Sequence, residues 1–311
     1  MNETLKTQGE EAHGWRAALE ALRPAQWTKN LLVLAALGFA WGDRARPDHV
    51  AAPATVAGVL LAAIVFCAVS SAVYLVNDLL DIEADRAHPL KRHRPIAARR
   101  LSPARARLLA TALLAGGGLL SLVFLPGPFL AIAAFYVLLQ SLYSIALKRI
   151  ALADIIVIAA GFVLRALAGA YAARVSFSPW LLLCAFFLAL FLAVGKRRHE
   201  KASLADNNAE QRPSLDRYSL RLLDQLAAIT AAVTIVVYAL YTQAPETVEK
   251  FGTSGMGFTL PFVVFGIFRY LDLLYRHNQG DQPEKALLAD RPLLVTIGLY
   301  GLTVLAIFMI Q

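Results

Sequence analysis

Long apolar blocks alternate with short polar or charged stretches along the whole chain. Blocks close to 20 residues match the length of an α-helix that crosses the hydrocarbon core of a bilayer. Charged residues, proline or glycine bound each block, so the pattern predicts nine membrane-spanning helices. They are expected at residues 26–42, 55–80, 104–125, 128–147, 151–173, 179–196, 222–243, 258–276 and 292–310. The expected fold class is an all-α polytopic membrane protein.

Composition supports this prediction. Of the 311 residues, 58% are hydrophobic and 17% are charged, and the mean hydropathy is +0.56. Soluble domains carry about 45–50% apolar and about 25% charged residues, so an ordinary soluble domain is excluded. Cys67 and Cys184 lie inside apolar blocks, and we expect them to be small buried hydrophobes. Residues 1–24 are polar and are expected to form a segment preceding a nine-helix domain at residues 25–311.

The positive charges indicate which side of the membrane each connection faces. Most of the 30 Lys and Arg residues lie in the N-terminal tail and in the connections after the second, fourth, sixth and eighth blocks. The opposite connections hold only Arg44, Arg46, Arg174 and Lys250. Cytoplasmic loops are enriched in Lys and Arg, so we expect the N-terminus and the basic connections to be cytoplasmic.

An acidic cluster, "NDLLDIEAD", directly follows the apolar run of the second block. We expect the second helix to continue through Asp85, so that Asn77, Asp81 and Asp85 stack on one face, with Asp78 beside Asp81. Oxygen ligands crowded on one face repel one another unless a cation bridges them, and such ligands favour Mg²⁺ or Mn²⁺. Because Mg²⁺ binds through one or two carboxylates plus substrate phosphates, the cluster predicts a diphosphate substrate.

A simpler interpretation treats the cluster as a solvated helix end neutralised by the cations that follow it. Asn77 and Asp78 count against this interpretation, because they lie at the apolar edge, where polar groups are usually functional.

The loop after the cluster is basic and punctuated by proline. Pro89 is expected to end the helix, and Ser102 to cap a helix that starts at Pro103. Lys91 and Arg94 would then lie close to the carboxylates and could bind phosphate oxygens. His88 and His93 are interpreted as structural or solvated rather than as metal ligands.

Two polar residues within the fifth block stand out. Asp154 and Arg165 are 11 residues apart and are expected to share a helix face. Arg165 should face the bundle interior and find an anion there, either in a neighbouring helix or on a substrate. Arg269 in the eighth block is similar.

Several ordered segments resemble the UbiA superfamily of intramembrane prenyltransferases, and most closely its decaprenyl-phosphate phosphoribosyltransferase branch. The acidic motif fits the pattern N-D-x-x-D-x-x-x-D of the superfamily. The segments that resemble the branch run from about residue 22 to 300: "LRPAQWTKNLLVLAAL", "NDLLDIEADRAHPLKRHRPIAA", "YSIALKRIALADIIVIAAGFVLRALAGA", "KRRHE", "DRYSLRLLDQL" and "PFVVFGIFRYL". The resemblance implies a nine-helix bundle with a polar cavity that faces the cytoplasm.

The chain departs from the ordinary prenyltransferases of this superfamily after the sixth block. Those enzymes carry a second motif there, D-x-x-x-D. Asp206 and Glu210 have its spacing but lie in a polar, loop-like stretch, and basic "KRRHEK" takes the helix end. This departure favours the phosphoribosyl branch.

The resemblance implies transfer of 5-phosphoribosyl from phosphoribosyl diphosphate to a polyprenyl phosphate, with release of diphosphate. Asp78, Asp81 and Asp85 are the implied catalytic residues, with Mg²⁺ (or Mn²⁺) held by Asn77, Asp81 and Asp85. The candidate substrate-binding residues are Lys29, Asn77, Lys91, Arg94, Tyr143, Lys148, Asp154, Arg165, Lys196 and Arg197. The cations among them could instead only set topology or reach toward the membrane surface.

Two rival functions stay open: a UbiA-type transfer of a polyprenyl group from its diphosphate to an aromatic acceptor, and transport of phosphorylated metabolites or lipids. The expected partners are the two substrates and the membrane, with no nucleic acid. A homo-oligomer is left open. The expected location is the bacterial plasma membrane, with the active site on the cytoplasmic side.

Overall fold

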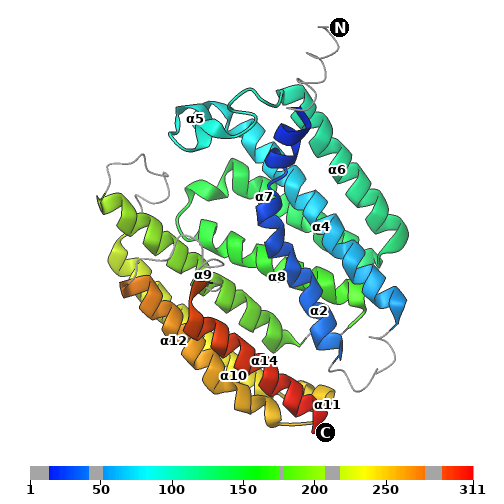
Figure 1. Ribbon diagram of the computed structural model, residues 1–311, viewed down its shortest axis with the longest axis vertical. Helices are drawn as coiled ribbons and strands as arrows, with labels where there is room; N and C mark the ends of the chain where they lie inside the picture. Colours follow the sequence, from blue (N-terminus) through cyan, green and yellow to red (C-terminus); the bar gives the residue numbers. More distant parts are fainter. Residues whose placement is uncertain (1–13, 42–51, 176–177, 207–217, 277–288, 311) are drawn as a thin grey trace. The chain divides into compact units, whose positions relative to one another are not determined.

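The computed structural model describes residues 14–41, 52–175, 178–206, 218–276 and 289–310. Within these ranges every regular element is helical (Figure 1). The expected all-α class is therefore confirmed.

Eight helical stretches are long and apolar enough to cross a membrane. Each coincides with one of the expected spans from the second to the ninth. The helices concerned are α4 (Pro53–Leu80), α6 (Pro103–Phe124), α7 (Gly127–Ile145), α8 (Ala153–Ala173), α9 (Pro179–Asp206), α10 (Leu220–Gln243), α12 (Leu260–Arg276) and α14 (Arg291–Met309). The chain is thus a multi-pass membrane protein.

The first expected span, residues 26–42, has a different form. It consists of a 3₁₀ helix, η1 (Pro24–Asn30), that continues into an eleven-residue α-helix, α2 (Leu31–Trp41). At their ordinary rises the two together reach about 30 Å, the thickness of a hydrocarbon core. The count of nine spans therefore depends on adding this composite element to the eight long helices among the described residues.

The sixth span differs in its length. We expected it to end at residue 196, but α9 continues through the charged sequence "KRRHEKASLAD" to Asp206. Lys, Arg and Glu are good helix formers, so a charged stretch can extend a helix beyond the bilayer. Asp206, expected in a loop, is the last residue of α9, and Glu210 lies outside the described residues.

The chain forms two compact units. The first comprises the described residues within 1–37, 52–147 and 164–175, and the second those within 38–51, 148–163 and 176–311, so that α8 contributes to both. In the first unit α4 packs against α6 and α7. Its core gathers apolar side chains from these helices, from α2 and from α8, including Val33, Phe66, Phe129 and Leu164.

In the second unit α9 packs along α10, and α12 packs along α14. The buried side chains here include Ile155, Leu223 and Phe191. Shorter elements connect the long helices: η3 (Leu147–Arg149), α11 (Pro245–Phe251) and η5 (Gly255–Thr259).

A glycine permits the closest backbone approach within the first unit. A Cβ atom added to Gly169 of α8 would lie 2.1 Å from the carbonyl oxygen of Val33 in α2. Small residues at such crossings let helices in membranes approach each other closely. Gly169 therefore fixes how α2 packs on the C-terminal part of α8.

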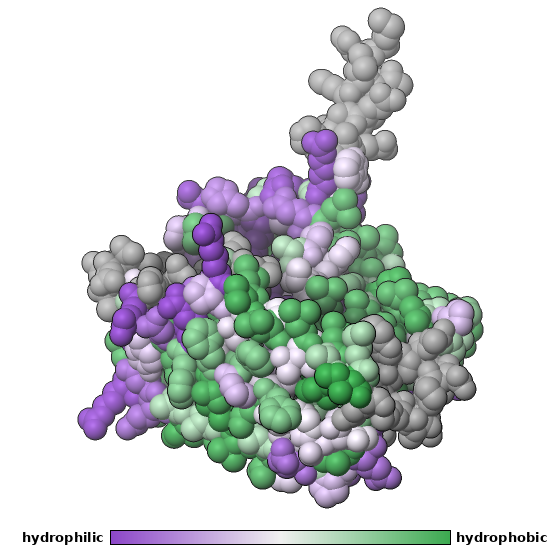
Figure 2. Space-filling model, turned by 60° about the horizontal axis from the view of Figure 1, so that its bottom comes forward, coloured by the Kyte–Doolittle hydropathy of each residue, from purple (hydrophilic) through white to green (hydrophobic). Residues whose placement is uncertain are grey.

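Large apolar side chains remain exposed along the spans, for example Leu119 of α6, Ile229 of α10 and Leu302 of α14. Figure 2 shows hydrophobic residues over much of the face that it displays, with hydrophilic residues toward its margins. In a membrane protein these side chains meet lipid, which explains why they need no protein cover. Cys184 is buried and Cys67 is half-buried, and both are free thiols.

Candidate active site

The helix that carries the acidic motif is interrupted inside the motif. We expected one helix through Asp85, but α4 ends at Leu80 and a short helix, α5 (Ile82–Ala87), begins after Asp81. Asp81 has φ −100° and ψ 13°, away from helical values. The regular stacking of Asn77, Asp81 and Asp85 on one continuous face is therefore not what the structure contains.

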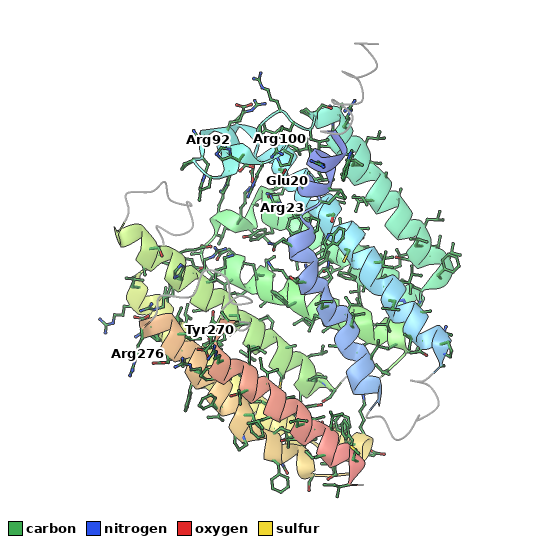
Figure 3. All side chains as sticks on the ribbon, viewed as in Figure 1. Glu20, Arg23, Arg92, Arg100, Tyr270 and Arg276 are labelled. Atoms are coloured by element: carbon green, nitrogen blue, oxygen red, sulfur yellow. The ribbon has the colours of Figure 1, made fainter. Side chains whose placement is uncertain are left out.

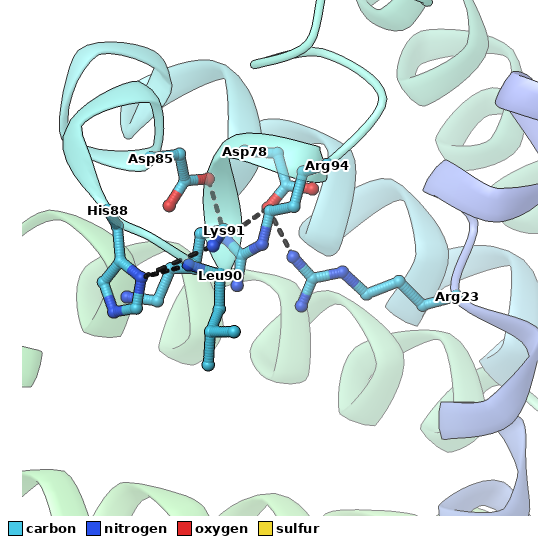
Figure 4. A network of polar contacts seen from close by, with 7 residues as sticks. All are labelled: Arg23, Asp78, Asp85, His88, Leu90, Lys91 and Arg94. Carbon is cyan, nitrogen blue, oxygen red and sulfur yellow. Dashed lines mark hydrogen bonds and ion pairs between the residues drawn. The ribbon is translucent and has the colours of Figure 1, made fainter.

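Asp78 is the most deeply held carboxylate of the motif. Its side chain is 2% exposed, and its Oδ1 atom accepts hydrogen bonds from both Arg23 and Arg94 (Figure 4). A buried carboxylate is costly unless charged partners compensate for its lost hydration. The two arginines supply that compensation.

Arg94 connects Asp78 to Asp85. Its Nη1 atom lies 3.1 Å from Asp78 Oδ1 and 2.7 Å from Asp85 Oδ2. The two oxygens are therefore within about 6 Å of each other. The break at Asp81 lies between these two buried carboxylates, and one guanidinium contacts both.

The basic loop after α5 has the expected start and end. Helix α5 stops at Ala87, just before Pro89, and Ser102 Oγ accepts a hydrogen bond from the Arg105 N–H at the start of α6. His88 Nδ1 accepts from the backbone N–H groups of Leu90 and Lys91, at 3.2 and 3.4 Å. The structural interpretation of His88 is thus confirmed: it holds the turn that places Lys91.

A surface ion pair joins the N-terminal helical segment, residues 14–21, to this loop. Glu20 accepts two hydrogen bonds from Arg100, and Arg100 also donates to the His93 carbonyl. Figure 3 labels Glu20 and Arg100 close to each other. The hydrogen bond from Arg100 lowers the pKa of the Glu20 carboxyl. The segment before residue 24 is therefore attached to the loop that carries Arg94.

Arg165 is buried in the first unit, as expected. It donates from Nε to Asn30 Oδ1 and from Nη2 to the Tyr136 hydroxyl, both at 2.8 Å. Its guanidinium also lies 4.8 Å from the centre of the Tyr136 ring. Both of these neighbours are neutral polar groups.

Asp154 does not share a network with Arg165. It lies in the second unit, where Arg197 donates from Nε to its Oδ2 atom at 2.9 Å and Tyr218 donates to its Oδ1 atom at 2.7 Å. Burial, helped by the bond to Asp154, raises the pKa of the Tyr218 hydroxyl, so it stays a neutral donor. Arg197 also pairs with Glu200. Two predicted substrate ligands, Asp154 and Arg197, are thus each other's partners.

The other predicted ligands are distributed over four helical elements. Lys29 is in η1, Tyr143 is near the end of α7, Lys148 is in η3 and Lys196 is in α9, and all four are half-buried. Arg269 of α12 is ion-paired with Asp272 and Asp290 in the second unit.

The motif offers oxygen ligands of the kind that Mg²⁺ prefers. Among the described residues no three His, Cys, Asp or Glu side chains gather closely enough to hold a metal by themselves. Mg²⁺ does not require such a group, since one or two carboxylates, substrate phosphates and waters complete its shell. The half-buried Asn77 and Asp81, with Asp85, fit this donor set. Asp78 fits it less well, because two arginines already hold its Oδ1 atom.

Sequence reasoning missed Arg23. It lies 55 residues before Asp78, in a segment that was expected to stand apart from the domain. The available signal was an arginine immediately before Pro24 at the entrance to the first span.

The chain is similar to proteins of known family. The model of the UbiA prenyltransferase family matches residues 31–289. The decaprenyl-phosphate phosphoribosyltransferase of Mycolicibacterium smegmatis is 37% identical over 282 residues, which cover 88% of this chain and 87% of that protein. That of Mycobacterium tuberculosis is 36% identical over 300 residues, 94% of each chain. A solved UbiA homolog from Archaeoglobus fulgidus, bound to GPP and Mg²⁺, has a TM-score of 0.69 at 19% identity, over 94% of this chain and 99% of that one.

Proposed function

The chain belongs to the UbiA prenyltransferase family and is a transferase, and we propose that it transfers 5-phosphoribosyl from phosphoribosyl diphosphate to a decaprenyl-type phosphate. The observation that carries this proposal is the 36–37% identity, over nearly the whole chain, to proteins with that activity in their names. The product lipid would serve as a precursor of the cell envelope.

The mixed acidic and basic character of the motif supports the proposal. Asp78 and Asp85 lie beside Arg23 and Arg94, and Lys91 is in the same loop. Carboxylates suit a divalent cation and guanidiniums suit phosphate oxygens, and a Mg²⁺–diphosphate substrate presents both.

We assign Mg²⁺, or Mn²⁺, to Asn77, Asp81 and Asp85. When bound, the ion would neutralise negative charge on the departing diphosphate. Asp78 contributes by holding the arginines rather than by ligating the metal.

In the proposed reaction the bond between ribose C1 and the diphosphate oxygen breaks, and a bond forms between C1 and an oxygen of the lipid phosphate. The diphosphate leaves with the bonding electron pair. The acceptor phosphate is already ionised at neutral pH, so no side chain has to remove a proton from it. What the protein supplies is the binding and orientation of two anions, which converts a two-body encounter into a positioned reaction.

The remaining cations are assigned to these anions. Lys91 and Arg94 are proposed to bind the donor, Lys148 with Tyr143 its 5-phosphate, and Lys29, Arg165 and Lys196 other substrate phosphates. The proposed location is the plasma membrane, with the acidic motif and the basic loop after α5 on the cytoplasmic side.

The family name also supports a second candidate, prenyl transfer to an aromatic acceptor. The basic C-terminal part of α9 counts against it. There Arg197 is committed to Asp154 and Glu200, and Arg198 to Asp224. Of the two residues with the spacing of the second motif, Asp206 ends α9 and Glu210 lies outside the described residues.

Purified protein should be incubated with Mg²⁺ and either of two substrate pairs: phosphoribosyl diphosphate with decaprenyl phosphate, or a polyprenyl diphosphate with an aromatic acid. We expect a phosphoribosylated lipid, detected by mass, only with the first pair. Product from the second pair alone would establish prenyl transfer instead.

A further inference from the structure

We propose that Arg23 is a substrate-binding residue, which together with Arg94 receives a phosphate group of the donor. Asp78 is the positioning residue that holds both guanidiniums. We call Arg23 and Arg94 the arginine pair. The inference rests on the proposed function, because the phosphoribosyl donor supplies the phosphate.

The burial of the three side chains differs in a way that favours this assignment. Asp78 is 2% exposed, while Arg23 and Arg94 are 25% and 26% exposed. The guanidiniums are therefore more accessible to a soluble ligand than the carboxylate that they flank. Figure 4 shows the arginines approaching the same carboxylate from separate segments of the chain.

The arginine pair also has hydrogen-bond donors to spare. A guanidinium carries five N–H groups. Within the described residues the side chain of Arg23 donates only from Nη2, to Asp78, and that of Arg94 donates only from Nη1. The remaining N–H groups suit phosphate oxygens, which arginine binds through two parallel hydrogen bonds.

The backbone of Arg23 is held in an uncommon conformation. Its φ of 54° and ψ of 61° lie in the left-handed region, directly before Pro24. Proline disfavours the right-handed helical conformation in the residue before it, and a bulky residue rarely occupies the left-handed one. The contact with Asp78 and the Tyr74 ring, 4.9 Å from the guanidinium, hold the side chain in place. Strained residues of this kind cluster at ligand sites.

Charge balance explains how two arginines can lie side by side. Asp78 and Asp85 offset Arg23 and Arg94, so the four side chains carry no net charge. Removal of either arginine would leave a buried carboxylate with less compensation, which is why the test needs a measurement of folding as well as of binding.

The first measurement is donor kinetics. Arg23→Ala should raise the KM for phosphoribosyl diphosphate about 10- to 100-fold, the effect of one charged hydrogen-bonding group, and leave the KM for the lipid phosphate unchanged. Arg23→Lys should have a KM for phosphoribosyl diphosphate between those of the wild type and Arg23→Ala, since lysine keeps the charge but not the planar guanidinium. The control is Arg16→Ala, an exposed arginine of the same N-terminal segment, with an expected change below about twofold. Asp78→Asn should raise the same KM, and less than multiplicatively when combined with Arg23→Ala.

The second measurement is binding of inorganic diphosphate without a divalent cation, detected as a thermal shift of the purified protein. Arg23→Ala should weaken this binding and Arg16→Ala should not. If the wild-type protein fails to use phosphoribosyl diphosphate while this difference persists, the proposed function is wrong and the arginine pair stands. If Arg23→Ala leaves both the donor KM and diphosphate binding unchanged, the inference is overturned. Should Arg23→Ala not fold, Arg23→Lys and Arg23→Gln decide by the same two measurements.

Discussion

The Nε atom of Arg197 lies 2.9 Å from Oδ2 of Asp154, and the two side chains are 2% and 0% exposed. An ion pair buried to this degree holds the C-terminal half of α9 to the start of α8 within the second unit. Tyr218 adds a hydrogen bond to the same carboxylate and accepts one from the Leu152 N–H. Both charges are thus engaged within the protein, which favours a structural role for Arg197 over direct binding of substrate.

Arg197→Ala should lower the free energy of unfolding by about 3–5 kcal/mol, because it leaves Asp154 buried without its charged partner. The measurement is unfolding by denaturant in mixed micelles. Lys201→Ala, on the same helix and only half-buried, should change stability by less than about 0.5 kcal/mol. An Arg197→Ala protein with unchanged stability and a raised KM for a substrate would indicate that Arg197 binds substrate.

Asp81→Asn and Asp85→Asn should each lower kcat/KM at least about 100-fold, since the assigned metal provides several kcal/mol of charge stabilisation. The measurement is formation of phosphoribosylated lipid across a Mg²⁺ titration. Glu83→Gln is the matched control, because Glu83 is 85% exposed and pairs with Arg86. Near-normal turnover of the two aspartate variants at saturating Mg²⁺ would refute the metal assignment.

Gly169→Ala should destabilise the protein by about 1–3 kcal/mol or more, because the new methyl group would overlap the Val33 carbonyl. Thermal unfolding would measure this loss. Gly118→Ala in α6 meets no atom within 4 Å and should be neutral or stabilising by about 0.5–1 kcal/mol. An equal change in thermal stability for the two variants would contradict the close approach of α2 and α8.

The Glu20–Arg100 pair should contribute stability that depends on pH. The folded protein holds the pKa of Glu20 below its ordinary value, so the contribution is present above that value, about 4.3, and is lost as pH falls through the folded pKa. Because both side chains are about half exposed, the expected size is below about 1 kcal/mol. Glu20→Gln should reduce the decline in thermal stability between about pH 5 and pH 3. An unchanged decline would show that other carboxyl groups cause it.

The positions of the long helices could be predicted from the sequence because lipid imposes a simple rule. A spanning helix needs about 20 apolar residues, and charges or proline mark its ends. The rule failed where charge does not end a helix: α9 runs ten residues beyond the expected limit of 196. It also gave no hint that the first span would begin as a 3₁₀ helix.

The site could be predicted only in its local part. The motif residues and Arg94 lie within one stretch of sequence, and their proximity follows from that. The contacts of Asp78 with Arg23 and of Asp154 with Arg197 join residues 55 and 43 positions apart, and no periodic pattern encodes such pairs. The break at Asp81 is invisible for a related reason, because it accompanies the bridge that Arg94 makes between two carboxylates. The assignment of individual ligands to metal and substrate stays a prediction.

Membrane proteins are often shortened at a polar N-terminal segment before expression, and here such a truncation would remove the residues before residue 24. Such a shortened protein would lack Glu20, which forms an ion pair with Arg100. It would also lack Arg23, one of the two arginines that pair with the buried Asp78. Its helices could all insert into the membrane while its affinity for the donor fell. An affinity tag fused close to this end could lower donor affinity in the same way.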